Sequence, residues 1–157
     1  MIKLFVGDNE EAAVLAAVEE FQQDLLEVTG TNVPIGSYGG YVSHKGFVIC
    51  TLNVGDDPLI RAKYAIDTSS LKGKCQSFMI RKNGDTIIIV GSDMLGTVFG
   101  IYHACEYLLG VDPIKFWTEI ASASRSLGEV FHLTKGPIDF GPPVIQCLFH
   151  PLLVVPP

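Results

Sequence analysis

The run from Asp85 to Gly110 constrains the fold of this chain more than any other part of its sequence: D-T-I-I-I-V-G-S-D-M-L-G-T-V-F-G-I-Y-H-A-C-E-Y-L-L-G. Thr86–Val90 is an unbroken run of β-branched residues, which predicts a buried strand. Gly91 allows a tight turn after that strand, and an apolar helix over residues 94–109 is expected to follow. The segment therefore predicts a sheet with a helix packed on it.

The predicted helix over residues 94–109 is apolar around most of its circumference, and its first charged residue is Glu106. Ser92 and Asp93 are candidate caps at its start, and Gly110 is the natural residue after its end. A helix that is apolar nearly all round is buried on more than one side. One side can face the sheet of this chain. We expect the other side to contact a partner, which is another domain, another chain or a second copy.

Gly91, Gly96 and Gly100 punctuate this segment. The first two, with Thr97, have the outline of a phosphate-binding loop, and they stand between a strand and a helix. Thr97 occupies the position of the phosphate-binding lysine, so a nucleotide-binding domain is the weakest of the function hypotheses. We predict a structural role for the glycines, because Gly96 and Gly100 share one stripe of the helix and allow close approach of a neighbour.

A second helix is predicted over residues 10–28, where apolar residues recur at 4-3-4-3 spacing. Glu10 and Glu11 are placed in its first turn, where the helix dipole favours acids, and Gly30 follows its end. A short helix is expected over residues 59–65, with Asp56-Asp57 before Pro58 as its cap.

Five runs predict strands: Ile2–Val6, Gly46–Leu52, Gln76–Arg81, Thr86–Val90 and Glu129–Leu133. Asn83-Gly84 between the third and fourth predicts a hairpin, so at least one pair is antiparallel. Residues 31–46 are glycine-rich and are expected to form a loop with room for one short strand. The fold class is therefore α+β, a mixed sheet with two main helices packed on it.

Composition excludes some classes of partner. The net charge is −6 and the 11 Lys and Arg are scattered, whereas nucleic acids and anionic membranes need a basic patch. No apolar run is long enough to span a membrane. Ile2–Val6 is too short for a secretory signal, so the sequence leaves localisation open. The four cysteines show no metal-ligand spacing and are expected to be reduced: Cys50, Cys75, Cys105 and Cys147.

No motif of a known catalytic site is present. His103 and Glu106 share one helix face, and we expect a structural or solvent-facing pair there. No pair of carboxylates can be nominated for glycoside chemistry. Trp117, the only tryptophan, is expected to be buried or to contact another domain, in preference to stacking on a sugar. We predict no cofactor and no metal.

Several segments resemble the domain that precedes the catalytic barrel in glycoside hydrolases of family 115, the xylan α-1,2-glucuronidases. V-G-S-D-M-L-G-T-V-F-G-I-Y over residues 90–102 resembles the pattern G-S-D-x-x-G-T-x-x-G-x-Y of that family. L-K-G-K-C-Q-S-F over residues 71–78 resembles L-x-G-K-W-E-x-F, with Cys75 in place of the tryptophan. V-D-P-I-K-F-W-T-E-I over residues 111–120 resembles V-S-P-W-Y-W-W-A-D-V. The resemblance covers residues 1–143, and more distant relatives occur in hexosaminidases.

The resemblance implies a non-catalytic accessory domain of an enzyme that removes (4-O-methyl)glucuronic acid from xylan. The partner would be the missing catalytic barrel, and Ser92, Asp93 and Trp117 would be the residues nearest to substrate. Residues 144–157 are apolar, uncharged and broken by proline, and they depart from the family. We expect them to be truncated or foreign sequence. The alternative is a stand-alone interaction module that uses the apolar face of helix 94–109.

Overall fold

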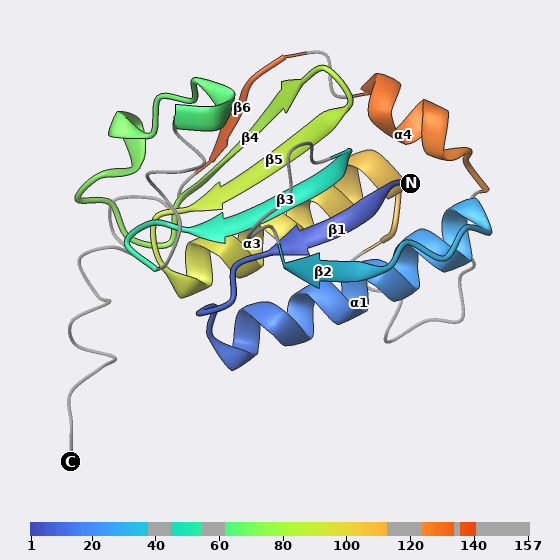
Figure 1. Ribbon diagram of the computed structural model, residues 1–157, viewed down its shortest axis with the longest axis horizontal. Helices are drawn as coiled ribbons and strands as arrows, with labels where there is room; N and C mark the ends of the chain where they lie inside the picture. Colours follow the sequence, from blue (N-terminus) through green and yellow to red (C-terminus); the bar gives the residue numbers. More distant parts are fainter. Residues whose placement is uncertain (38–44, 55–61, 113–123, 134–135, 141–157) are drawn as a thin grey trace.

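The computed structural model describes residues 1–37, 45–54, 62–112, 124–133 and 136–140 (Figure 1). Its strands form a six-stranded sheet in the order β2-β1-β3-β5-β4-β6. The strands are β1 Lys3–Val6, β2 Ile35–Ser37, β3 Gly46–Thr51, β4 Phe78–Asn83, β5 Thr86–Gly91 and β6 Ile138–Phe140. The helical elements are α1 Ala12–Thr29, the 3₁₀ turn η1 Ser69–Leu71, α3 Met94–Ala104, the π-helical turn η2 Cys105–Leu109 and α4 Leu127–Leu133.

The sheet is mixed. Strands β2, β1, β3 and β5 run parallel, and β4 is antiparallel to both β5 and β6. This arrangement confirms the predicted α+β class, with a hairpin joined to a parallel sheet. The central strands β3 and β5 are buried along their whole length, as expected of parallel strands covered on both faces.

Helices α1 and α3 lie side by side against one face of the sheet (Figure 1). Alternate strand residues point to that face and build the larger core. Phe21 of α1 meets Phe47 of β3 edge to face, with ring centroids 5.0 Å apart. Gly30 ends α1 in the left-handed conformation, at φ 67°, and its N–H donates to Leu26 O. The predicted second helix and its stop are therefore confirmed.

The opposite face of the sheet carries a second, smaller core. Ile66 and Leu71, from the segment that contains η1, cover Val48 of β3 and Ile88 of β5 there. In Figure 1 this segment is the green one that precedes β4. Residues 62–64 are helical, which agrees with the end of the helix predicted over residues 59–65. The beginning of that helix and the cap at Asp56-Asp57 lie outside the described residues.

The predicted strand at 129–133 is wrong, because this segment forms helix α4. Ser126 and Glu129 make a capping box at its start. Ser126 Oγ accepts a bond from Glu129 N at 3.2 Å, and the Glu129 carboxylate accepts one from Ser126 N at 2.6 Å. This reciprocal pair satisfies two amides at the helix start. The local capping signal therefore prevails over the β-prone residues Val130 and Phe131.

Two further boundaries differ from the prediction. Helix α1 begins at Ala12, so Glu10 and Glu11 precede it instead of filling its first turn. The predicted hairpin is present but tighter than expected, because Lys82 and Asn83 pair with Ile87 and Thr86, which leaves Gly84-Asp85 as the loop instead of Lys82–Asp85. Gly84 adopts φ 58° as the first loop residue, a position that favours glycine in tight hairpins.

Candidate functional site

The strands β1, β3 and β5 end at one edge of the sheet, and α1 and α3 begin beside it (Figure 1). In open sheets of this kind, ligands bind outside the carboxyl ends of the parallel strands. Polar side chains gather at this edge, which we call the carboxyl edge: Glu10, Thr51, Ser92, Asp93 and Thr97. It is the first of two candidate sites.

Ser92 and Asp93, predicted from the sequence, both bind the backbone that enters β4. Asp93 caps α3, because its Oδ1 accepts a bond from Gly96 N at 2.7 Å. Its Oδ2 accepts a second bond from Gln76 N at 2.9 Å. Ser92 Oγ accepts a bond from Ser77 N at 3.0 Å. The cap role expected of Asp93 is therefore confirmed, and both side chains connect the start of α3 to the start of β4.

The three glycines lie where the α3 segment meets its neighbours. A β-carbon at Gly96 would lie 2.2 Å from Ser77 O, and one at Gly100 would lie 2.8 Å from Cγ2 of Ile89. At Gly91 it would lie 2.1 Å from Thr97 N. None of these positions has room for a side chain. The amide that would meet a phosphate, that of Gly96, already donates to the Asp93 carboxylate, which disfavours an anion at this turn.

Behind this turn lies a buried, hydrogen-bonded group of side chains that the sequence analysis did not predict: Glu10, Thr51 and Thr97. The two carboxylate oxygens of Glu10 accept bonds from Thr51 N at 2.7 Å and Thr51 Oγ1 at 2.8 Å. The hydroxyls of Thr51 and Thr97 are 2.6 Å apart. Burial raises the pKa of Glu10, and the hydrogen bonds from Thr51 partly oppose that rise. The carboxyl group thus connects the loop before α1 to β3 and α3.

The local sequence around Glu10 does not reveal its buried role, because its hydrogen-bond partner is distant in the sequence. An acid just after the turn Gly7-Asp8-Asn9 is typical of a first helical turn, and the sequence analysis placed Glu10 there. Its partner Thr51 is 41 positions away, so only the pairing of β1 with β3 brings them together.

His103, which shares a helix face with Glu106, contacts aromatic rings of β4 and η2. The His103 ring packs on Phe78, with centroids 5.4 Å apart, and stacks on Tyr107 at 5.9 Å. Burial lowers the pKa of His103, and the charge of Glu106 opposes this shift. Within the part of the chain that the structure describes, no three metal-ligating side chains come together. No described helix is long and apolar enough to cross a membrane.

Part of the apolar circumference of α3 and η2 is exposed. Helix α1 packs beside α3, so this chain covers a second side of that helix itself. Phe99, Tyr102 and Tyr107 nevertheless remain 43%, 45% and 48% exposed. We call these three residues the aromatic stripe. A hydrogen bond from the Tyr102 hydroxyl to Glu20, at 3.1 Å, fixes one of its members against α1.

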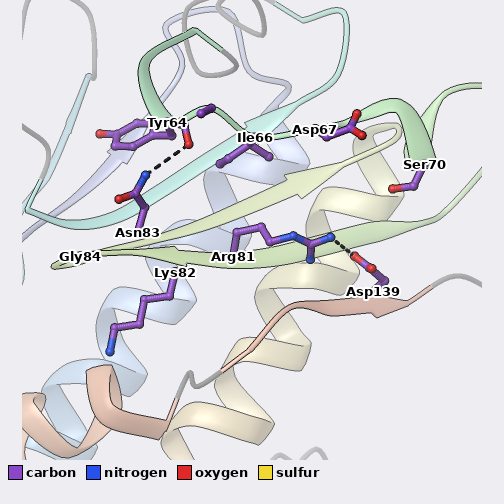
Figure 2. Close-up of a pocket in the computed structure, with 10 residues that line it drawn as sticks. Tyr64, Ile66, Asp67, Ser70, Arg81, Lys82, Asn83, Gly84 and Asp139 are labelled. Atoms are coloured by element: carbon purple, nitrogen blue, oxygen red, sulfur yellow. Dashed lines mark hydrogen bonds and ion pairs between the residues drawn. The ribbon is translucent and has the colours of Figure 1, made fainter.

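The second candidate site is a groove of about 540 Å³ on the sheet face opposite α1 and α3 (Figure 2). The sequence analysis assigned a site role to none of its residues. Strand β4 forms one wall, the segment around Tyr64–Asp67 forms another, and Asp139 of β6 lies at the edge: Tyr64, Ala65, Ile66, Asp67, Ser70, Arg81, Lys82, Asn83, Gly84 and Asp139 line it.

Two interactions shape the groove. Arg81 forms an ion pair with Asp139, at 2.8 Å, and its Nη1 donates to Ile80 O at 3.0 Å and Ile138 O at 3.3 Å. Asn83 donates to Tyr64 O at 3.2 Å. Lys82 points to the other side of the sheet, where its ammonium donates to Phe131 O at 2.5 Å. The polar groups of the groove therefore come from alternate residues of β4 and from two flanking segments.

The other predicted residues fall as follows. Trp117 and Cys147 lie outside the described residues. Ser92 and Asp93, the other two residues predicted to lie nearest to substrate, stand at the start of α3. Among the described cysteines, Cys50, Cys75 and Cys105 are thiols, and the first and third are buried.

No protein-family model matches the sequence, and no curated protein does. Solved structures do match. One is a family GH115 4-O-methyl-α-glucuronidase with specificity for decorated arabinogalactans, with a TM-score of 0.69 and 23% sequence identity over 80% of this chain. This chain shares its fold with part of that glycoside hydrolase. The match spans only 16% of the enzyme's length, and an identity this low establishes the fold alone.

Two other glycoside hydrolases match less closely. A GH138 enzyme targeting pectin rhamnogalacturonan II gives a TM-score of 0.45 and 18% identity over 90% of this chain and 12% of its own. The GH20 β-N-acetylhexosaminidase from Streptomyces coelicolor A3(2) gives a TM-score of 0.44 and 16% identity, over 69% of this chain and 17% of its own. Scores of this size carry no argument about this chain.

Proposed function

We propose that this chain is a non-catalytic accessory domain of a family 115 α-glucuronidase, an enzyme that removes (4-O-methyl)glucuronic acid from glucuronoxylan. The observation that carries the proposal is the match to part of a GH115 enzyme, at a TM-score of 0.69 over 80% of the chain. The motifs over residues 71–78, 90–102 and 111–120 support it, because they stand in the order of that family.

The chemistry of the carboxyl edge supports a non-catalytic role. Glycoside hydrolysis needs two carboxyl groups that face the scissile bond. Here the carboxylates of Glu10 and Asp93 both accept hydrogen bonds from backbone amides of this chain. Each is therefore committed to holding the fold and is not directed at a substrate.

Two measurements test this proposal. The purified chain should release no glucuronic acid from glucuronoxylan or from aldouronic acids, and release above a heat-treated control would show that it is itself an enzyme. The transcript beyond the Gly141 codon should encode a catalytic barrel, whose acids supply the reaction. A transcript that encodes no barrel would overturn the assignment as an accessory domain.

The aromatic stripe favours a second candidate, a stand-alone interaction module. Aromatic residues are enriched where proteins bind one another, and Phe99 and Tyr102 of α3 and Tyr107 of η2 are exposed. Gel filtration with light scattering separates the two candidates. An orphaned accessory domain should aggregate through the stripe, whereas a stand-alone module should give one stoichiometric species that Phe99→Glu converts to monomer.

A further inference from the structure

We infer that residues 65–76, which we call the flap, open as a hinged unit over the smaller core while the rest of the sheet stays folded. In the closed state the flap covers Val48 and Cys50 of β3 and Ile88 of β5 (Figure 1). Opening exposes these apolar side chains and the Cys50 thiol to solvent. The inference concerns a motion of the described fold and stands whatever enzyme the chain belongs to.

Both ends of the flap have the backbone conformation of a strained hinge. Ala65 and Gln76 adopt φ 50°, in the left-handed region that residues with a side chain seldom occupy. A hydrogen bond holds the chain at the first end, where Asn83 Nδ2 donates to Tyr64 O at 3.2 Å. Another holds it at the second end, where Gln76 N donates to Asp93 Oδ2 at 2.9 Å. Strain of this kind persists only where the surrounding structure imposes it, so it favours movement about these two points.

Between the hinges, few side chains anchor the flap. Ile66 and Leu71 pack into the smaller core, at 7% and 4% exposed, and Thr68 is the third buried residue of the flap. The other residues of the flap are exposed or half-buried. Backbone bonds such as Leu71 N to Thr68 O, at 3.0 Å, join near neighbours within the flap. Segments with few buried apolar contacts open at the lowest free-energy cost.

A buried hydroxyl group favours the open state. Thr68 is 1% exposed, and within the part of the chain that the structure describes its Oγ1 has no hydrogen-bond partner. An unpaired buried hydroxyl keeps its desolvation cost in the closed state, and water removes that cost when the flap opens. The burial of Ile66 and Leu71 is therefore opposed by this hydroxyl and by the two strained φ angles. The closed state is favoured by a small margin only.

The groove of Figure 2 lies along one flank of the flap. Its volume of about 540 Å³ separates residues 64–67 and Ser70 from the β4 residues 81–83. The flap therefore has no closely packed interface with β4 on this flank. Opening extends the groove over the apolar face of β3 and β5, which the flap covers in the closed state.

Thiol labelling of the wild-type chain tests the inference. Iodoacetamide reacts with Cys50 only when the smaller core opens, because Cys50 is 1% exposed, and peptide mass spectrometry measures its labelling separately from the other thiols. The free energy of opening obtained from Cys50 should be smaller than that of global unfolding and should depend less on urea, because opening the flap exposes less surface. Equal free energies with equal urea slopes would show that this core opens only when the whole domain unfolds, which would overturn the inference.

Three variants assign the opening to the flap. Thr68→Val keeps the shape of the side chain and removes the unpaired hydroxyl, so it should slow the labelling of Cys50 by roughly tenfold. Ile66→Val weakens an anchor and should speed labelling by about threefold to tenfold. The matched control is Ile101→Val in the larger core. It should lower the urea midpoint of global unfolding but leave the labelling rate of Cys50 unchanged, because Ile101 stays buried when the flap opens.

Two results with these variants would also contradict the inference. If Ile101→Val sped the labelling of Cys50 as much as Ile66→Val does, the opening would involve the larger core. If Thr68→Val left the labelling rate unchanged, the unpaired hydroxyl would not enter the balance between the closed and open states.

Discussion

At the scale of single residues, Glu10 connects more of the fold than its sequence context suggests. It accepts two hydrogen bonds from Thr51, whose hydroxyl meets that of Thr97. One carboxyl group therefore joins the loop before α1 to the end of β3 and the first turn of α3. Since burial raises its pKa, the native state favours the protonated form of Glu10 relative to the unfolded chain.

Glu10 should make stability depend on pH. A raised native pKa contributes stability that is present below the unfolded pKa and is lost as pH rises through the native pKa. Glu10→Gln removes the charge and keeps an acceptor for Thr51 N, so it should gain stability relative to the wild type between pH 4 and pH 7. Urea denaturation at both pH values measures this. Glu10→Ala, which loses the bonds, should be destabilised at both. A Gln variant whose relative stability falls as pH rises would contradict the account.

Asp93 should prove structural. Asp93→Ala removes the cap on Gly96 N and the bond to Gln76 N, and should lower the free energy of unfolding by about 1–2 kcal/mol. Asp93→Asn should cost less, because its one oxygen still caps α3. Asp8→Ala, at an exposed acid, is the control and should change stability by less than about 0.5 kcal/mol. If Asp93→Ala and the wild type were equally stable in urea, Asp93 would not be needed for the fold, and a role in ligand binding would become the better explanation.

At the scale of elements, α3 is held against the hairpin by small residues on its sheet-facing side. A β-carbon at Gly96 would collide with the backbone of Ser77, and one at Gly100 would meet Ile89 and Phe78. The bulky residues Phe99 and Tyr102 are on the exposed side. Helix α3 can therefore approach the hairpin closely because the face that carries Gly96 and Gly100 lacks β-carbons. The turn that follows β5 orients this face toward the sheet.

Substitutions at Gly100 test the close packing. A β-carbon there would lie 2.8 Å from Ile89 Cγ2 and 3.2 Å from Phe78 Cβ, so Gly100→Ala should destabilise despite its better helix propensity. Gly100→Val should cost more, about 1–3 kcal/mol through overpacking. Gly128→Ala is the matched control in α4, because its nearest neighbour would be 3.8 Å away. It should gain up to about 1 kcal/mol. A stabilised Gly100→Ala variant would refute the packing.

At the scale of the whole molecule, the sheet is covered on both faces by parts of its own chain. Helices α1 and α3 build the larger core, and the segment before β4 builds the smaller one. Strand β6, which the sequence reasoning did not predict, completes the edge beside β4. The described fold ends there, because residues 141–157 lie outside it.

Removal of residues 144–157 should leave the fold intact. This segment is apolar and carries no Asp, Glu, Lys or Arg, and Pro151 interrupts it. A chain ending at residue 143 should keep its melting temperature and gain solubility. Differential scanning calorimetry measures the first. A fall of more than about 5 °C, the shift expected for roughly 1 kcal/mol, would show that the segment packs on the domain.

Local sequence patterns correctly predicted the elements whose formation depends on residues close together in the sequence. The β-branched run of β5, the 4-3-4-3 spacing of α1 and the glycine ends of α1 and η2 each carry their own periodicity or stop signal. The cap at Asp93 is local too, because its partner Gly96 is three residues on. Where a local signal was overlooked, as in the Ser126–Glu129 box, the prediction failed.

The sequence by itself determined the α+β class, the two main helices and the packed glycine turn. Only the tertiary structure decided which distant residues share a surface. Glu10 meets Thr51, and Arg81 meets Asp139, across 41 and 58 positions. Such pairs arise from the strand order β1-β3 and β4-β6. Strand order follows from how the whole chain buries its apolar surface, and no stretch of sequence encodes that alone.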